Sequence, residues 1–97
     1  MTIDNTIIEL LQARDGQAQK EFYKGFYPAM FNLCRGFLGD YHDAQEAVND
    51  GLLSIFNKIE GFEYRDPGSF VGWVKTVMIN ACKMRARAGE RRWVLWG

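Results

Sequence analysis

The chain has 97 residues, of which 47% are hydrophobic and 25% are charged, and these values predict one globular domain rather than two. Its 12 basic and 12 acidic residues cancel overall, yet residues 1–74 carry 11 acidic against 6 basic side chains and residues 75–97 carry 6 basic against 1 acidic. No apolar run is long enough to cross a membrane and no signal peptide opens the chain, so we expect a cytoplasmic protein without membrane insertion.

Two helices are predicted in the first part of the chain. One covers residues 5–14 and ends at Asp15-Gly16, and the next covers residues 17–38. Within the second helix, Pro28 removes a backbone hydrogen bond, so we expect a bend or break near Tyr27. The apolar positions are Ile7, Ile8, Leu10 and Leu11 in the first helix, and Phe22, Phe26, Met30, Leu33 and Phe37 in the second.

A third helix is predicted over residues 41–60, between the stop residues Gly39 and Gly61 and with Asp40 as its N-cap. At about 100° per residue it has two opposite faces. Two interpretations of the polar face stay open: a solvated surface with a stray leucine, or a docking surface with an apolar centre and a polar rim. The core face holds Ala44, Val48, Leu52, Ile55 and Ile59, and the polar face holds Glu46, Asn49, Asp50, Leu53 and Asn57.

A fourth helix is predicted over residues 70–88, with Ser69 as its N-cap. It completes a helical domain of residues 1–90, and residues 91–97 form a basic, then apolar tail or the start of a linker. One side of the fourth helix carries a stripe of cationic and hydrogen-bonding side chains. Such a stripe suits phosphates and base edges, but it is also typical of a solvated face. That stripe holds Thr76, Asn80, Lys83 and Arg87, and the core stripe holds Phe70, Trp73, Val74, Val77, Ala81 and Met84.

The loop "FEYRDPGS" (residues 62–69) is rich in aromatic residues next to the cationic stripe. Aromatic rings beside cations are suited to gripping unstacked bases. Alternatively, Phe62, Tyr64, Phe70 and Trp73 are core anchors, an interpretation that is stronger for Phe70 and Trp73 because both fall on the core stripe. We expect Tyr64 and Arg65 to be exposed.

Neither catalysis nor a cofactor is indicated. The chain has no nucleophile–base pair, carboxylate dyad or phosphate-binding glycine loop, so an enzyme is not expected. Cys34 and Cys82 lack Cys-x-x-Cys spacing and His42 is the single histidine, so we predict reduced thiols and no metal site.

Several short motifs occur in a fixed order between residues 8 and 88. They are Gly39-Asp40, Asp43-Ala44 with the acidic and amide-rich helix, Phe56, Phe62, and Ser69-Phe70-x-x-Trp73 with Asn80 behind it. In this order and spacing they resemble region 2 of bacterial sigma factors, specifically the small extracytoplasmic-function (ECF) class. The resemblance implies a compact all-α bundle of about four helices.

The resemblance also implies two binding sites. In that family the helix matching residues 41–60 docks on the β′ clamp helices of core RNA polymerase, which implies a dock at Glu46, Asn49, Asp50 and Leu53. The loop and the next helix recognise and melt the promoter −10 element, and a flipped base of the non-template strand enters a pocket. The residues implied for this DNA contact are Tyr64, Arg65, Asp66, Ser69, Phe70, Thr76, Asn80, Lys83 and Arg87.

The chain departs from the family pattern at three points. Region 4, which reads the −35 element in ECF sigma factors, is missing from these residues. Met84 stands where an acidic or amide residue is common, and the family often has a longer basic run after the fourth helix. The last two points leave the promoter sequence open. Two other functions also stay open: a sigma-like module that binds polymerase or an anti-sigma protein without melting DNA, and a general single-stranded nucleic-acid binder.

Overall fold

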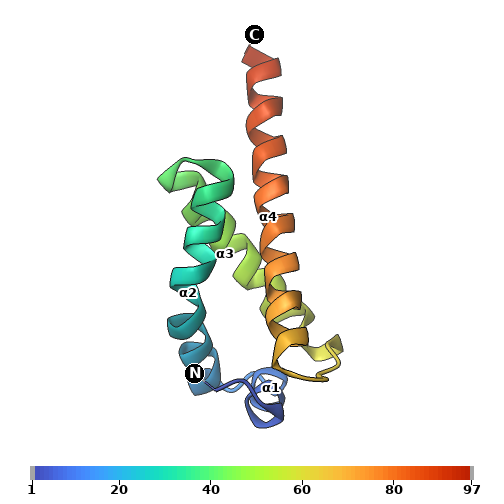
Figure 1. Cartoon of the computed structure of the whole chain (residues 1–97). Coiled ribbons are helices and arrows are strands. Elements are labelled where there is room, and N and C mark those ends of the chain that lie inside the picture. Colours follow the sequence, from blue (N-terminus) through green and yellow to red (C-terminus); the bar gives the residue numbers. More distant parts are fainter. Residues whose placement is uncertain (1, 97) are drawn as a thin grey trace.

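The computed structural model of the chain describes the backbone of residues 2–96 and the side chains of residues 2–88. Its elements are α1 (Asn5–Gln12), α2 (Gly16–Leu38), α3 (Tyr41–Lys58), the 3-10 turn η1 (Ile59–Gly61) and α4 (Pro67–Trp96). The predicted all-α class with about four helices is confirmed. α2, α3 and α4 pack against one another, and α1 closes the end of the bundle where α2 begins (Figure 1).

Each of the four helices is preceded by an aspartate that caps it. The aspartate carboxylate satisfies one of the backbone N–H groups that a helix start leaves without a partner. The predicted cap Asp40 is confirmed, whereas Ser69 is not the cap of α4, because Pro67 already suits the first helical position. The bonds, between 2.8 and 3.0 Å long, run from the N–H of Ile7 to Asp4, Ala18 to Asp15, Asp43 to Asp40, and Ser69 to Asp66.

α2 continues through Pro28 without a break, so of the bend or break expected near Tyr27, the break is wrong. Proline inside a helix costs roughly 3 kcal/mol. Phe22 and Met30, on either side of it, are both buried in the core. Burial of each such side chain contributes about 1.5–3 kcal/mol, which offsets the local cost. The helix ends at Gly39, whose φ of 77° lies in the left-handed region that glycine tolerates.

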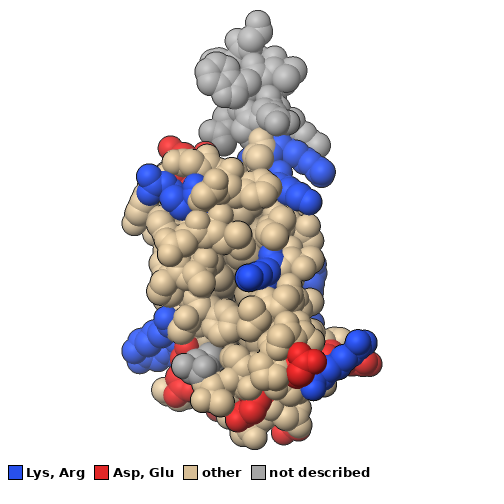
Figure 2. Space-filling view, in the orientation of Figure 1, with Lys and Arg blue, Asp and Glu red and all other residues tan. Residues whose placement is uncertain are grey.

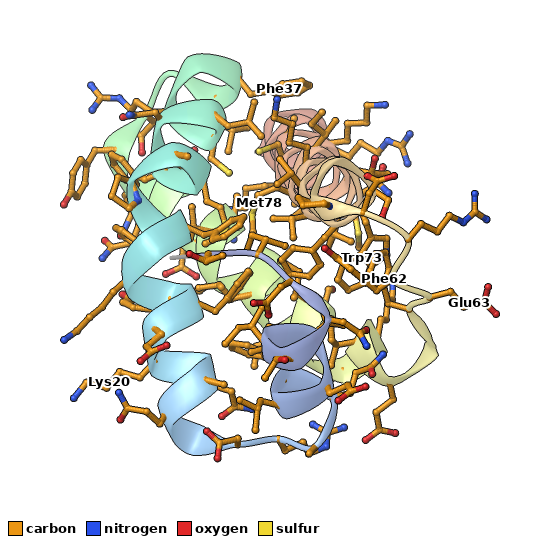
Figure 3. The ribbon with its side chains drawn as sticks, turned by 60° about the horizontal axis from the view of Figure 1, so that its bottom comes forward. Lys20, Phe37, Phe62, Glu63, Trp73 and Met78 are labelled. Atoms are coloured by element: carbon orange, nitrogen blue, oxygen red, sulfur yellow. The ribbon has the colours of Figure 1, made fainter. Side chains whose placement is uncertain are left out.

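One core joins the helices. Its largest fully buried side chains include Phe22 of α2, Ile55 of α3 and Phe70 of α4. Met78 of α4 lies inside the bundle (Figure 3), directly against Gly51 of α3, where an added Cβ would overlap the Met78 thioether. The glycine therefore lets α3 and α4 approach closely.

Cys34 of α2 and Cys82 of α4 meet inside this core. Both are free thiols, as predicted, and their sulfur atoms lie 3.0 Å apart. Burial, followed by the contact with Cys82, raises the pKa of the Cys34 thiol to about 12. A thiol that stays neutral packs as a small apolar group, so the pair contributes to the core of the α2–α4 interface.

Helix ends differ from the predictions by a few residues, most of all in α4. α1 ends at Gln12, and the last turn of the predicted third helix is η1. α4 begins at Pro67 rather than Phe70 and its backbone continues to Trp96 rather than ending near Ala88, past the ends of α2 and α3 (Figure 1). The predicted apolar tail falls within this extension, and the side chains of Trp93 and Trp96 lie outside the described residues. Among the described residues, no helix has both the length and the apolar composition that crossing a bilayer requires.

Candidate functional site

α3 has one buried side and one exposed side, as its periodicity predicts. The buried side consists of Ala44, Ala47, Val48, Gly51, Leu52 and Ile55. On the opposite side Asn49 and Asp50 are exposed, Glu46 is partly buried, and Leu53 keeps 63% of its surface exposed. These last four residues are here named the α3 outer face.

The α3 outer face combines negative charge with an open apolar centre. Within the described part of the chain, neither Glu46 nor Asp50 lies within ion-pair distance of a basic side chain. Leu53 gives a partner a hydrophobic contact, and the unpaired carboxylates favour a partner with basic groups. The face is therefore suited to a protein surface that is basic around an apolar groove.

The loop between η1 and α4 is fixed where it leaves the bundle. The side-chain amide of Gln12 donates to the carbonyl oxygens of Ile59 at 3.1 Å and Phe62 at 2.8 Å. A 3.1 Å ion pair between Arg14 and Glu60 adds a second link. The C-terminal end of α1 thus positions the start of the loop.

Aromatic side chains hold the loop against the first turns of α4. The ring of the fully buried Phe70 lies 5.7 Å from Phe62 and 6.2 Å from Trp73 between centroids, and Phe62 and Trp73 are 4.9 Å apart. Phe62 and Trp73 are only partly buried, so part of each ring stays accessible. Tyr64 is partly buried against the core and donates a long 3.5 Å hydrogen bond to the carbonyl of Ile3. The expectation that Tyr64 is exposed is therefore wrong.

Asp66 and Ser69 bond to each other within the turn. The Asp66 carboxylate accepts from the Ser69 N–H, and the Ser69 hydroxyl donates to the Asp66 carbonyl, both at 2.8 Å. The hydroxyl oxygen also accepts from the N–H groups of Arg65 at 3.4 Å and Asp66 at 3.3 Å. Since a hydroxyl has one proton to donate, Ser69 shapes the turn instead of offering that proton to a ligand.

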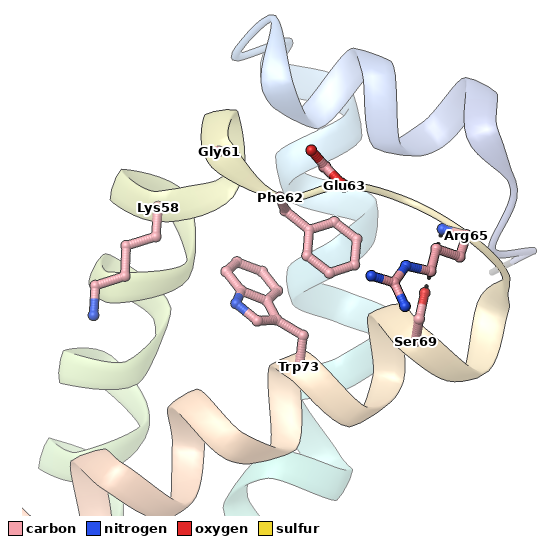
Figure 4. A pocket seen from close by; sticks show the side chains of 7 residues that line it. All are labelled: Lys58, Gly61, Phe62, Glu63, Arg65, Ser69 and Trp73. Atoms are coloured by element: carbon pink, nitrogen blue, oxygen red, sulfur yellow. Dashed lines mark hydrogen bonds between the residues drawn. The ribbon is translucent and has the colours of Figure 1, made fainter.

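An open pocket of about 490 Å³ lies between the end of α3, the loop and the start of α4. In Figure 4 the rings of Phe62 and Trp73 occupy its middle, with Lys58 on one side and the Arg65 guanidinium on the other. Aromatic walls between two cations are suited to an unstacked base with its phosphates. The pocket is lined by Lys58, Gly61, Phe62, Glu63, Arg65, Ser69 and Trp73.

Only part of the predicted nucleic-acid set meets at this pocket. Arg65 is exposed, as predicted, and lines the pocket together with Ser69. Asp66 is used as the cap of α4. Phe70 has none of its surface exposed, so its side chain packs beneath the pocket and is not accessible to a ligand, which corrects its placement among the DNA contacts.

The other predicted residues form a separate stripe further along α4. Thr76, Asn80, Lys83 and Arg87 are exposed on one side of the helix and are named the α4 polar stripe. The Thr76 hydroxyl donates to the Gly72 carbonyl at 3.0 Å, which leaves its oxygen free to accept. This stripe offers two cations and two hydrogen-bonding groups to an anionic partner.

Sequence reasoning missed three contributors. Lys58 and Glu63 line the pocket, although neither was among the predicted contacts. Lys58 is the last residue of α3, one short turn before the loop, and this closeness in the chain was a signal that it could flank a pocket of the loop. Gln12 reaches carbonyls 47 and 50 residues further along the chain, and no local pattern predicts such a bond.

A family model covers most of this structure. The model described as Sigma-70 region 2 matches residues 22–92, which include the α3 outer face, the loop pocket and the α4 polar stripe. Neither a search of curated proteins nor a search of solved structures finds a match. The resemblance in the motifs and the family model agree on the same segment, and the chain belongs to the sigma-70 region 2 family.

Proposed function

We propose that this chain is the region 2 domain of an ECF-class sigma factor, acting in the cytoplasm as a non-catalytic initiation factor. In this proposal it binds core RNA polymerase and recognises and melts the promoter −10 element. An anti-sigma protein is a further proposed partner. The family match over residues 22–92 carries the proposal, because it coincides with two accessible surfaces of opposite charge.

The α3 outer face is the proposed polymerase dock. Basic groups on the β′ clamp helices would pair with Glu46 and Asp50, and Leu53 would fill an apolar groove between them. Asn49 is exposed beside them and can donate or accept a hydrogen bond at the rim. The support for this role is the combination of unpaired carboxylates with a leucine that is 63% exposed.

The loop pocket and the α4 polar stripe are the proposed promoter contacts. A base flipped out of the non-template strand would enter between Arg65 and Lys58 and stack on the accessible parts of Phe62 and Trp73. Asn80 and Thr76 would contact the strand beyond the pocket, and Lys83 and Arg87 would bind its phosphates. Tyr64, Asp66, Ser69 and Phe70 support this site through the fold of the loop.

The polymerase dock is tested by titrating the labelled chain with purified bacterial core RNA polymerase. Glu46→Lys with Asp50→Lys should weaken binding by a factor of about 30 or more, since reversed charges meet basic groups. The matched control is Glu9→Lys with Glu21→Lys, which makes the same charge change at exposed positions of α1 and α2. Equal losses in both variants would mean that overall charge, not the α3 outer face, governs binding.

The promoter contact is tested with the chain bound to core polymerase and a pool of −10 strands of randomised sequence. The wild-type chain should enrich one sequence, and Asn80→Ala should broaden the enriched set more than it lowers total binding. A general single-strand binder would enrich none. Polymerase binding with no strand retention would indicate a module that binds polymerase without melting DNA.

A further inference from the structure

We propose that α2 carries a second contact for single-stranded nucleic acid, separate from the loop pocket. Figure 3 places Lys20 of α2 on the opposite side of the molecule from Phe62 and Trp73. The proposed contact, named the α2 stripe, consists of Lys20, Tyr23, Lys24, Tyr27, Phe31 and Arg35, together with Tyr41 at the start of α3.

The α2 stripe follows from helical spacing. Lys20, Lys24, Tyr27, Phe31 and Arg35 follow one another at steps of three or four residues in a continuous helix, so they share one side. Figure 2 shows basic side chains at both ends of the edge that α2 forms. The only acid of α2, Glu21, lies at the margin of this side, three residues before Lys24, and accepts a hydrogen bond from Gln17 at 3.4 Å.

The aromatic members of the stripe form an unbroken row. Successive ring centroids lie 5.1 Å apart for Tyr23 and Tyr27, 6.0 Å for Tyr27 and Phe31, and 5.1 Å for Phe31 and Tyr41. The Arg35 guanidinium lies 6.0 Å from the centre of the Tyr41 ring. Tyr27 and Phe31 are half-buried, but Tyr23 is 44% and Tyr41 58% exposed. Both ends of the row are thus open to a ligand.

The charge of the stripe is not neutralised within the bundle. Among the described residues, Lys20, Lys24 and Arg35 are in no ion pair. The acids nearest to Tyr41 in the chain are engaged elsewhere: Asp40 caps α3, and Asp43 pairs with Arg85 at 3.4 Å. Unpaired cations favour a polyanion, and phosphates are therefore the complementary charge.

The rings select an unpaired strand over a duplex. Bases can stack on tyrosine only where they are not already stacked in a helix, and this contact tolerates any sequence. From Lys20 to Arg35 the stripe extends about 22 Å along α2, enough for several nucleotides. The α2 stripe would therefore hold a melted strand without recognising its base sequence, in contrast to the loop pocket.

Binding of a fluorescent oligo-dT to the full chain, measured at several salt concentrations, tests the contact. Lys20→Gln with Lys24→Gln and Arg35→Gln should weaken binding about tenfold at low salt and reduce the log–log salt slope by about 2, at roughly 0.7 per phosphate contact. Tyr23→Ala with Tyr41→Ala should weaken binding about tenfold with the slope unchanged. The matched control is Asn32→Ala, at an exposed α2 position outside the stripe, and circular dichroism verifies the fold.

Photo-crosslinking separates the α2 stripe from the promoter contacts proposed above. Oligo-dT carrying 5-iodouracil should crosslink to Tyr23 or Tyr41, and should still do so in the Lys83→Gln/Arg87→Gln variant. Crosslinks confined to the loop and α4, or unchanged affinity in both α2 variants, would overturn the proposal. Displacement of the oligonucleotide by an acidic peptide without any tyrosine crosslink would also overturn it and indicate a protein-binding surface. Neither experiment contains polymerase, so failure of the α3 dock would leave both outcomes unaffected.

Discussion

The α3 outer face and the loop that leads into α4 use their polar side chains in different ways. On α3, Asn49, Asp50 and Leu53 are exposed, because the helix satisfies its own backbone groups and its opposite side is buried. Where the loop joins α4, Asp66 and Ser69 bond to backbone groups of the turn. A loop has no internal ladder of hydrogen bonds, so its side chains must first stabilise the loop itself.

This difference divides the candidate residues into contacts and supports. A contact should affect binding and leave the stability of the domain unchanged, whereas a support should affect stability first. Four substitutions test the division, in order of decreasing expected effect.

Phe70→Ala is expected to have the largest effect, on stability. Phe70 is fully buried against Phe62 and Trp73, so its truncation should cost about 3–5 kcal/mol of the free energy of unfolding. Urea denaturation followed by circular dichroism measures it. A loss below about 1 kcal/mol together with weaker DNA binding would make Phe70 a contact after all.

Leu53→Ala should separate binding from stability on α3. Its side chain is 63% exposed, so the free energy of unfolding should change by less than about 0.5 kcal/mol. Polymerase affinity should fall by about 1–2 kcal/mol, because the side chain is the apolar centre of the proposed dock. Leu10→Ala, at a leucine of α1 that is 41% exposed, is the matched control and should leave affinity unchanged. Equal effects of the two substitutions would contradict a specific dock.

Asp66→Ala should destabilise the domain by about 1 kcal/mol, since α4 loses its N-cap. Asp66→Asn should restore most of the stability because an amide oxygen can also accept the Ser69 N–H. Thermal unfolding of the two variants measures the difference. If both variants unfold like the wild type and only DNA binding changes, Asp66 belongs with the contacts.

Lys83→Ala with Arg87→Ala should have the smallest effect on stability and a distinct effect on salt dependence. Both side chains are exposed, so the free energy of unfolding should stay within about 0.5 kcal/mol of the wild-type value. The log–log salt slope of strand binding should decrease by about 1.4. Arg85→Ala, which removes the ion pair with Asp43, is the control and should leave the slope unchanged. An identical slope in all three proteins would mean that the α4 polar stripe is only solvated.

Local patterns in the sequence determined the helices and their faces. Residues three and four apart share a side of a helix wherever that helix lies, so the buried and exposed sides of α3 and the α4 polar stripe could be predicted. Asp40 and Gly39 act on backbone groups within a few residues, and their roles as cap and stop were predictable for the same reason.

Tertiary contacts decided the rest. α2 continues through Pro28 because Phe22 and Met30 are buried in a core that other helices complete. The loop takes its path because Gln12 bonds to the carbonyls of Ile59 and Phe62. Contacts between residues so far apart in the chain depend on how the helices pack, and this packing has no signature in any short stretch of sequence. The same packing decided which aromatic rings line the pocket and which support it from within the core.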